Sequence, residues 1–393
     1  MPSIDRMTQR APLSVLDLSP FGSGQTPADG LRASIRLAQR AEALGYRRYW
    51  LAEHHLNPGV AGAAPHVLLA AIAEATRSIR IGTAATIIGN DTPLRIVEAA
   101  GVVSALHPGR FDLGIGRSGS RRPAEPSAPS SAPADRNVDG LVVPAPFAFA
   151  VDAPRFLAQA RLLARGDGDP ADRFDDDVRD ILALIAGTYS PPERVPIHAT
   201  PAEGEDIEVW IHGSTAGPSA RLAGELGLPF GANYHVAPFF VLEAIAAYRA
   251  AFRPGRLAAP RVIVSVDVLV ADTEEQAQRL AAGYPRWVHS IRAGQGAIPY
   301  PTPEEALADP LTDEEAAVVH DRVVTRFVGA PGSVVAQLET LQRVTGADEL
   351  LVTSITHDPA DRERSYELLA AAWADQPGRS ADRRRLATAG SGR

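Results

Sequence analysis

Short apolar segments alternate with amphipathic helical segments along most of the chain, and this alternation limits the folds that the chain can adopt. In the first part of the chain, apolar strands are predicted at residues 13–18, 48–52, 78–86 and 110–116. The helices between them begin at Thr26-Pro27, Pro65 and Pro93, where a residue suited to cap a helix or to occupy its first turn starts each helical pattern. Strands separated by helices are parallel strands joined by helical crossovers.

The alternation resumes after residue 206 and brings the number of predicted strands to eight. The later strands are expected at 207–211, 227–233, 261–271 and 349–354, and the later helices at 174–186, 220–226, 238–252, 273–292, 331–344 and 362–374. Eight strands and the absence of a G-x-G-x-x-G motif after the first strand favour a (β/α)8 TIM barrel over a doubly wound sheet. We expect one barrel domain over residues 12–375, followed by a flexible tail at 376–393.

One segment interrupts the alternation. Residues 118–146 follow the fourth predicted strand and are rich in Pro, Ala and Ser. Such composition favours an extended or disordered insertion. Because the insertion leaves the barrel at the carboxyl end of a strand, a second interpretation is a lid over the site.

The composition excludes several classes of function. The chain has no cysteine, and all 39 basic residues are arginine, so thiolate chemistry and lysine Schiff bases are excluded. A formal charge of −8 argues against a nucleic-acid partner. No apolar run reaches the roughly 18 residues of a membrane span, so we expect a cytoplasmic protein with no membrane association.

The strand at 48–52 ends in Glu53-His54-His55, which are candidates for chemistry. The carboxyl ends of barrel strands meet at one mouth, where catalytic residues are usually found. An acid and two imidazoles could bind a metal, but neighbouring residues of an extended strand point to opposite sides, and the chain has no H-E-x-x-H motif. We therefore expect no metal site, and a structural role for His55.

Arg117 follows the fourth strand directly, and a loop of small residues follows the fifth. Arg117 could form a surface ion pair, or its guanidinium could bind a phosphate. The loop holds Gly213, Ser214, Gly217 and Ser219, and a helix begins near Ser219 and Ala220, so backbone N–H groups there could approach an anion. Ala84 and Ala85, small residues at the third strand's end, could let a flat ring lie against the backbone.

These motifs, taken in order, resemble the bacterial luciferase-like flavin monooxygenase family. The matching segments are WLAEHH at 50–55, IGTAA at 81–85, TPLR at 92–95, PGRFDLGIGR at 108–117, LGLP at 226–229 and GADEL at 346–350. The resemblance covers most of residues 12–117 and 207–373 and implies a (β/α)8 barrel, in agreement with the strand count.

The resemblance also implies a cofactor and a reaction. Reduced FMN, supplied by a separate and transiently bound flavin reductase, would react with O2 to form a C4a-hydroperoxide that oxidises a small organic substrate. The isoalloxazine would lie against Ala84-Ala85, joined by a cis peptide bond, and the phosphate against Arg117, Ser219 and Ala220. Glu53 corresponds to a carboxylate beside the flavin, and His54 to a base whose pKa should lie near neutral.

The resemblance leaves other interpretations open. Asn90, at the same mouth, is grouped with the cofactor-binding residues. A reactive cysteine of luciferase is replaced here by Gly116, so no role is transferred to that position. Alternatives are a deazaflavin (F420)-dependent hydride-transfer enzyme, a non-catalytic flavin-binding relative, and a metal-dependent hydrolase. The substrate is not identified. The resemblance implies a homodimer, because the helices expected at 65–76 and 93–106 correspond to those through which relatives dimerise.

Overall fold

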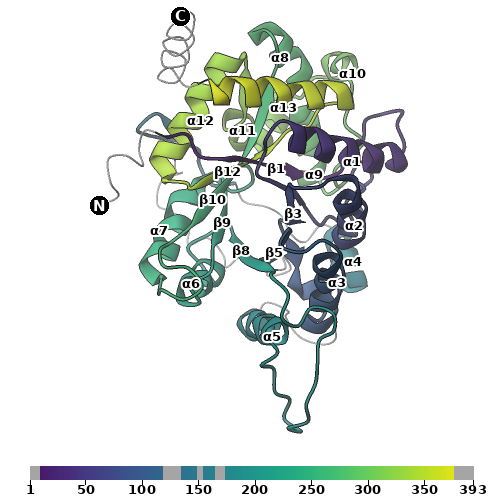
Figure 1. The fold of residues 1–393 in the computed structure, drawn as a ribbon. Helices are drawn as coiled ribbons and strands as arrows, with labels where there is room; N and C mark the ends of the chain where they lie inside the picture. The colour runs from purple at the N-terminus through teal and green to yellow at the C-terminus, as the bar shows by residue number, and fades with distance from the viewer. Residues whose placement is uncertain (1–8, 118–133, 148–153, 164–172, 376–393) are drawn as a thin grey trace, which may run out of the picture.

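Eight parallel strands form a closed barrel at the centre of the molecule (Figure 1). The computed structural model describes residues 9–117, 134–147, 154–163 and 173–375. Strand β12 pairs with β1 and closes the ring, so the doubly wound alternative is wrong and the predicted TIM barrel is confirmed. The barrel strands, in spatial order, are β1 (Leu13–Asp17), β2 (Arg48–Leu51), β3 (Arg80–Thr83), β5 (Phe111–Gly116), β8 (Glu208–Gly213), β9 (Phe230–Asn233), β10 (Val262–Val270) and β12 (Glu349–Thr353).

Helices surround the barrel and bury the outer faces of its strands. Thr26 caps α1 in a capping box with Asp29, as its sequence predicts, and α3 and α5 have the predicted bounds. The helices are α1 (Pro27–Ala43), α2 (Pro65–Ala75), α3 (Pro93–Leu106), α4 (Pro154–Leu163), α5 (Phe174–Ala186), α6 (Pro218–Glu225), α7 (Val241–Ala251), α8 (Glu274–Ala281), α9 (Tyr284–Arg292), α10 (Pro303–Ala308), α11 (Asp313–Val324), α12 (Pro331–Thr345) and α13 (Pro359–Ala374). Among the described residues, none of these helices combines the length and the apolar character needed to cross a membrane.

The segment 273–325 differs from the prediction. The single helix expected at 273–292 is two helices, α8 and α9, which meet at Gly283. A Cβ at Gly283 would lie 2.8 Å from the Tyr300 ring, so a close approach of the chain requires glycine there. Helix α10, helix α11 and the short strand β11 (Phe327–Gly329) were not predicted.

Residues 134–146 form a hairpin, so the expectation of an extended or disordered insertion is wrong for this part. Strands β6 (Arg136–Val138) and β7 (Leu141–Val143) are joined at Asp139-Gly140, where both residues have positive φ. Asp-Gly is a favoured pair for such a tight turn. The hairpin packs on the barrel, where the Tyr234 hydroxyl donates to the Val142 carbonyl at 2.7 Å. Residues 118–133 and the predicted tail at 376–393 lie outside the described part of the chain, which leaves the lid interpretation and the tail as predictions.

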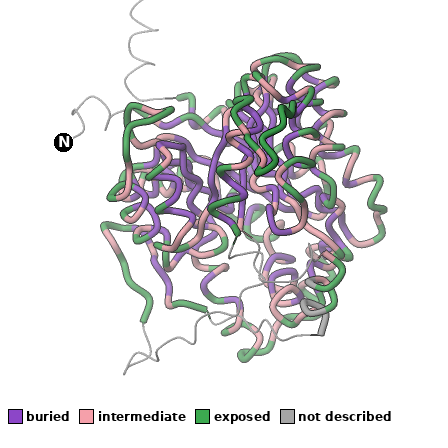
Figure 2. Tube along the Cα trace, turned by 90° about the horizontal axis from the view of Figure 1, so that it is seen from below, coloured by how far each residue is buried: buried purple, intermediate pink, exposed green. Residues whose placement is uncertain are grey.

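Apolar side chains fill two regions. One lies between the strands and the helices, and the other lies inside the barrel, where Trp50, Trp210, Ile263 and Leu351 are buried. Figure 2 shows the buried segments gathered in the middle of the molecule and the exposed segments at its periphery.

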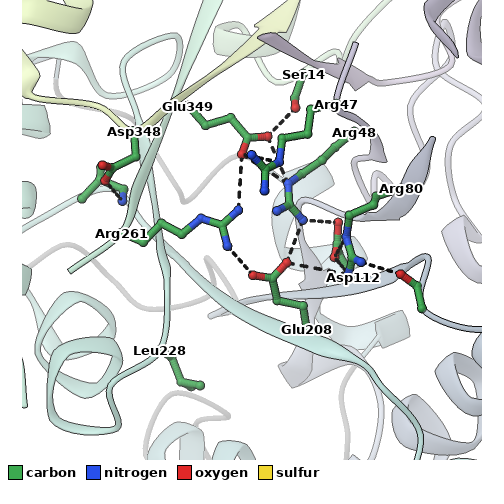
Figure 3. A network of polar contacts seen from close by, with 12 residues as sticks. Ser14, Arg47, Arg48, Arg80, Asp112, Glu208, Leu228, Arg261, Asp348 and Glu349 are labelled. Atoms are coloured by element: carbon green, nitrogen blue, oxygen red, sulfur yellow. Dashed lines mark hydrogen bonds and ion pairs between the residues drawn. The ribbon is translucent and has the colours of Figure 1, made fainter. Parts of the chain in front are cut away.

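The amino ends of the strands carry a buried network of charges (Figure 3). Arg48 lies at its centre and is 1% exposed. Its guanidinium donates to Asp112 at 2.6 Å, to Glu208 at 2.9 Å and to Glu349 at 3.0 Å. Burial by itself would lower the pKa of Arg48, but these three carboxylates raise it above its ordinary value. The charged base of the barrel therefore joins four strands, and the opposite end is left for the candidate site.

Candidate functional site

A cavity of about 700 Å³ opens at the carboxyl ends of the barrel strands. Nine of the eleven residues predicted for the site line it: Glu53, His54, Ala84, Ala85, Arg117, Gly213, Ser214, Gly217 and Ser219. Asn90 and Ala220 are not among its lining residues. Most of the predicted residues thus come together, although they lie up to 166 positions apart in the sequence (from Glu53 to Ser219).

Small residues form one wall of the cavity. The peptide bond between Ala84 and Ala85 is cis, as the resemblance implies, and it separates β3 from the short strand β4 (Thr86–Ile87), so the strand expected at 78–86 is interrupted. A Cβ at Gly116 would lie 3.0 Å from the Ala85 side chain. Only small side chains therefore occupy this wall, and a flat ring has room against it.

Glu53 is a fixed carboxylate at the mouth. It accepts hydrogen bonds from the Ile87 backbone N–H at 3.0 Å, from the Asn90 amide at 2.8 Å and from His55 Nε2 at 2.9 Å. Asn90 and His55 therefore position Glu53, and neither lines the cavity. The Asn90 amide is engaged by Glu53, and the cofactor-binding role of Asn90 and the structural role of His55 stay predictions.

His54 differs from Glu53, because one of its imidazole nitrogens forms no hydrogen bond with any described residue. Its Nδ1 is buried and has no hydrogen-bond partner among the described residues. Burial, reinforced by the neighbouring His55, lowers the pKa of the His54 imidazole to about 4. The expectation of a pKa near neutral is wrong for this reason. His54 is neutral at pH 7, and it lines the cavity.

Arg117 and the 213–220 loop lie side by side, because they follow neighbouring strands. Gly116 and His212, the residues just before them, are partners in the β5–β8 ladder. Arg117 makes no ion pair with any described residue, in contrast to the first of its two predicted interpretations. Helix α6 begins at Pro218 after Gly217, and Ser219 in its first turn lines the cavity. Ala220 is wholly buried, so its side chain does not face a ligand.

Two further imidazoles, those of His212 and His235, line the cavity and were not predicted as site residues. Burial lowers the pKa of both His212 and His235 to about 4. His235 Nδ1 lies 2.6 Å from the Ser265 hydroxyl, whereas His212 Nε2 has no partner among the described residues. Their positions directly after apolar strands were the signal available in the sequence.

The opposite wall was not predicted. It is formed by residues from β10, β12, α9 and α11, among them Asp267, Trp287, Arg322 and Thr353. Asp267 stands in the apolar run VIVSVDVLV of β10, and a charged residue at an inward position of such a strand was the available signal. In the described part of the chain, no three His, Asp or Glu side chains are arranged to bind a metal ion.

Comparison with known proteins decides the family. The model of the luciferase-like monooxygenase family matches residues 12–139 and 161–349. The chain belongs to this family. Family membership is consistent with an oxidoreductase, and it agrees with the resemblance found from the motifs.

Individual relatives align over most of the chain. The YvbT protein of Bacillus subtilis (strain 168) is 37% identical over 365 residues, which are 92% of this chain and 96% of that protein. A luciferase-like monooxygenase of Escherichia coli (strain K12) is 32% identical over 357 residues, covering 90% of this chain and 95% of its own. The crystal structure of apo-MsnO8 superposes with a TM-score of 0.74 at 32% identity, and the match covers 94% of this chain and 100% of that one.

Proposed function

We propose that the protein is a monooxygenase that uses reduced FMN, supplied by a separate flavin reductase, and O2 to oxidise a small organic substrate. The observation that carries the proposal is the cavity that brings together His54, the Ala84–Ala85 wall and the Arg117 region. A cavity of this size is typical of small-molecule and cofactor sites. The proposal includes a cytoplasmic location, because the reductase must hand over FMN in the same compartment.

The residues present fit a flavin phosphate at one end of the cavity. The Arg117 guanidinium is paired with no described carboxylate, and the start of α6 offers backbone N–H groups at its positive end. The Asn233 amide donates to the Ser214 hydroxyl at 2.8 Å and so fixes the loop. The wall of Ala84, Ala85 and Gly116 then faces the position that the ring system would take.

The protein groups around that position have separate tasks. When bound, reduced FMN would supply the two electrons that, with two protons, place one oxygen atom of O2 in the substrate and release the other as water. His54 can accept a proton, because its imidazole is neutral and its Nδ1 is free of partners among the described residues. Three hydrogen bonds hold the Glu53 carboxylate in place. The apolar side chains of Leu16 and Leu18 line the cavity and restrict water there.

Replacing Arg117 with methionine should weaken FMN binding and spare riboflavin binding. Hydrogen bonds to a charged group contribute about 1.5–3 kcal/mol, or roughly 10- to 100-fold in affinity, and riboflavin lacks the phosphate. Fluorescence titration of both flavins measures the effect, and Arg256→Met, at an exposed site away from the cavity, is the control. Equal losses for the two flavins would show that Arg117 does not bind the phosphate.

The second candidate is hydride transfer with the deazaflavin F420. A specific observation favours it: solved structures with this fold include both an FMN complex of the oxygenating constituent of 3,6-diketocamphane monooxygenase (20% identity, TM-score 0.62) and an F420-dependent secondary alcohol dehydrogenase (13% identity, TM-score 0.61). Titration of the protein with FMN and with F420, followed by O2 consumption with a reductase, separates the two. Binding of F420 but not FMN would overturn our proposal, and FMN binding without any O2 consumption across a substrate panel would favour a non-catalytic flavoprotein.

We also propose that two copies of the chain form a dimer through α2 and α3. Large apolar side chains are exposed on these helices: Val67 (74%), Leu94 (44%), Val102 (48%) and Leu106 (68%). Exposed apolar patches commonly mark protein–protein contacts.

The double variant Val102→Asp/Leu106→Asp is expected to sediment as a monomer, because two carboxylates would be buried in the interface. Leu307→Asp, at an exposed position on α10, is the matched control and should leave the dimer unchanged. A monomeric native protein at the same concentration would disprove the interface.

A further inference from the structure

We propose that Asp267 and Thr353 bind a hydroxyl or primary amide group of the substrate, and that the substrate therefore combines an apolar body with a neutral group that donates a hydrogen bond. This inference rests on the proposed function for its use of the cavity. It concerns the wall formed by β10, β12, α9 and α11, for which the flavin has no evident use. In the closed strand order, β10 and β12 lie across the barrel from β3 and β5, which carry the Ala84–Ala85 wall and Arg117.

Two oxygen atoms without partners lie on this wall. Asp267 and Thr353 are each 2% exposed, and both line the cavity. The Oδ1 atom of Asp267 and the Oγ1 atom of Thr353 have no hydrogen-bond partner among the described residues. A buried polar atom without a partner is unfavourable, so a ligand that supplies a donor gains from filling the position.

The strand register makes these two atoms a pair. Asp267 and Thr353 are Cα partners in the β10–β12 ladder. Side chains alternate along a strand, and Ile263 and Leu351 on the same two strands belong to the cluster inside the barrel. Asp267 is four residues from Ile263 and Thr353 is two from Leu351, so both face the barrel interior and can contact one ligand group.

The remaining contacts of Asp267 hold its carboxylate in place and put a positive charge beside it. Its Oδ2 atom accepts from the Tyr284 hydroxyl and from Arg322 Nη2, the latter at 3.3 Å. Burial would lower the pKa of Arg322, but Tyr284 and Asp267 offset this and raise it, so the guanidinium stays charged. The Oδ2 atom thus has two donors among the protein side chains, and Oδ1 is left to accept a hydrogen bond from a ligand.

The charges around the pair select a neutral ligand group. Besides Arg322, the guanidinium of Arg326 lies 4.2 Å from the centre of the Tyr284 ring. Arg322 beside the carboxylate and Arg326 over the Tyr284 ring disfavour an ammonium ion, and the free Oδ1 of Asp267 repels a carboxylate. Trp287 Nε1, also buried and without a partner among the described residues, lies on the same cavity wall and offers a donor. A hydroxyl or a primary amide can both donate and accept, as this set of atoms requires.

The apolar lining shows where the rest of the substrate would lie. Leu16, Leu18, Ile291 and Ile355 line the cavity together with Trp287. They leave an apolar space beside the polar pair, and His54 belongs to the same cavity. A substrate anchored at Asp267 and Thr353 would extend its apolar body through this space.

The test is binding of a matched panel to the full-length protein without flavin. The probes share a hexyl body and differ in the end group: 1-hexanol, hexanamide, hexyl methyl ether, hexylammonium and hexanoate. Quenching of tryptophan fluorescence reports binding, since Trp287 lies in the cavity. We expect 1-hexanol and hexanamide to bind on the order of tenfold more tightly than the other three, the equivalent of one hydrogen bond.

Variants assign the preference to the two residues. Thr353→Val, which keeps the shape of the side chain, and Asp267→Asn should each reduce the preference for 1-hexanol over the ether. Thr345→Val is the matched control, because Thr345 is a buried threonine whose hydroxyl donates to the Leu341 carbonyl in α12, away from the cavity. Thr353→Val keeps the test informative if Asp267→Asn does not fold.

Either of two results would overturn the inference: tighter binding of the ether, the ammonium or the carboxylate, or an unchanged preference in folded Thr353→Val. Because no flavin is present, the outcome is independent of the FMN titration. Selective binding of 1-hexanol without FMN binding would support this subsite and contradict the proposed function. FMN binding without a preference for 1-hexanol would support the proposed function and contradict this subsite.

Discussion

Substitution of His54 by alanine is expected to abolish oxygenation and to leave FMN affinity nearly unchanged. A positioned acid or base typically contributes about 10²- to 10⁴-fold to the rate, so turnover should fall by at least two orders of magnitude. The pKa of about 4 means that the proton-accepting form is present above that pH. Turnover due to His54 should therefore stay level between about pH 6 and 8 and fall as the pH drops through about 4.

His66 offers a matched control for this experiment. Its imidazole is also buried, its pKa is also lowered to about 4 by burial, and its Nε2 atom has no partner among the described residues. His66 packs near Phe111 and does not line the cavity. The His66→Ala variant should keep native turnover if it folds. Loss of FMN affinity equal to the loss of turnover in His54→Ala would show that His54 acts in binding.

Substitution of Arg48 by methionine should strongly destabilise the fold. Arg48 donates to three carboxylates, and its removal leaves Asp112 and Glu349, which are 0% and 1% exposed, without their central cation. Breaking a buried ion pair from one side typically costs about 3–5 kcal/mol. A loss of this size should appear in the free energy of unfolding measured with denaturant. Arg80 still donates to Asp112 and Arg261 to Glu208, but only Arg48 contacts Asp112, Glu208 and Glu349 together (Figure 3).

Arg47→Met is the matched control, because it removes a neighbouring positive charge and leaves Arg48 in place. Arg47 is 47% exposed in its side chain and lies 3.6 Å from Glu349, so its loss should change stability by less than about 1 kcal/mol.

The stability that Arg48 provides should also depend on pH. Burial raises the pKa of Glu208, but Arg48 and Arg261 outweigh burial and hold that pKa below its ordinary value. The stability from Glu208 is thus present above the pKa of its unfolded form and is lost in acid. The difference between the native protein and Arg48→Met should narrow below about pH 4, and equal stability at pH 7 would contradict the role assigned to Arg48.

The barrel could be predicted because its local signals and its packing agree. Parallel strands buried on both faces appear as short apolar runs, and Thr26-Pro27 and Thr92-Pro93 mark helix starts that the structure confirms. The interruption of β3 was not predictable from the residues alone, since Ser78–Thr86 contains no proline that would mark a break. Helices α10 and α11 were not predicted, although Thr302 and Thr312 each form a capping box. Helix α10 is only 6 residues long and follows a segment rich in Pro and Gly.

The site could be predicted as far as residues follow strands directly. Glu53, His54 and Arg117 stand immediately after apolar runs, so their place at the mouth follows from the fold. The contact of Asn90 with Glu53 was not predicted, because it depends on the path that the chain takes after β3. The wall with Asp267 was missed because its meaning depends on which atoms of Tyr284 and Arg322 are already engaged, and such information exists only in three dimensions.

The space around His212 restricts how this barrel can evolve. An ideal Cβ at Gly231 would lie 2.2 Å from His212 Nδ1, and one at Gly114 would lie 2.9 Å from Nε2. The imidazole therefore occupies room that two neighbouring strands leave by lacking side chains. A side chain at position 231 is blocked while histidine is present at 212, and it becomes accessible only after position 212 has become smaller. A side chain at position 114 is blocked in any case, because an ideal Cβ there would also lie 2.0 Å from the Thr83 carbonyl oxygen. A library that varies position 231 alone would find it intolerant, whereas one that varies positions 212 and 231 together could reshape the floor of the cavity.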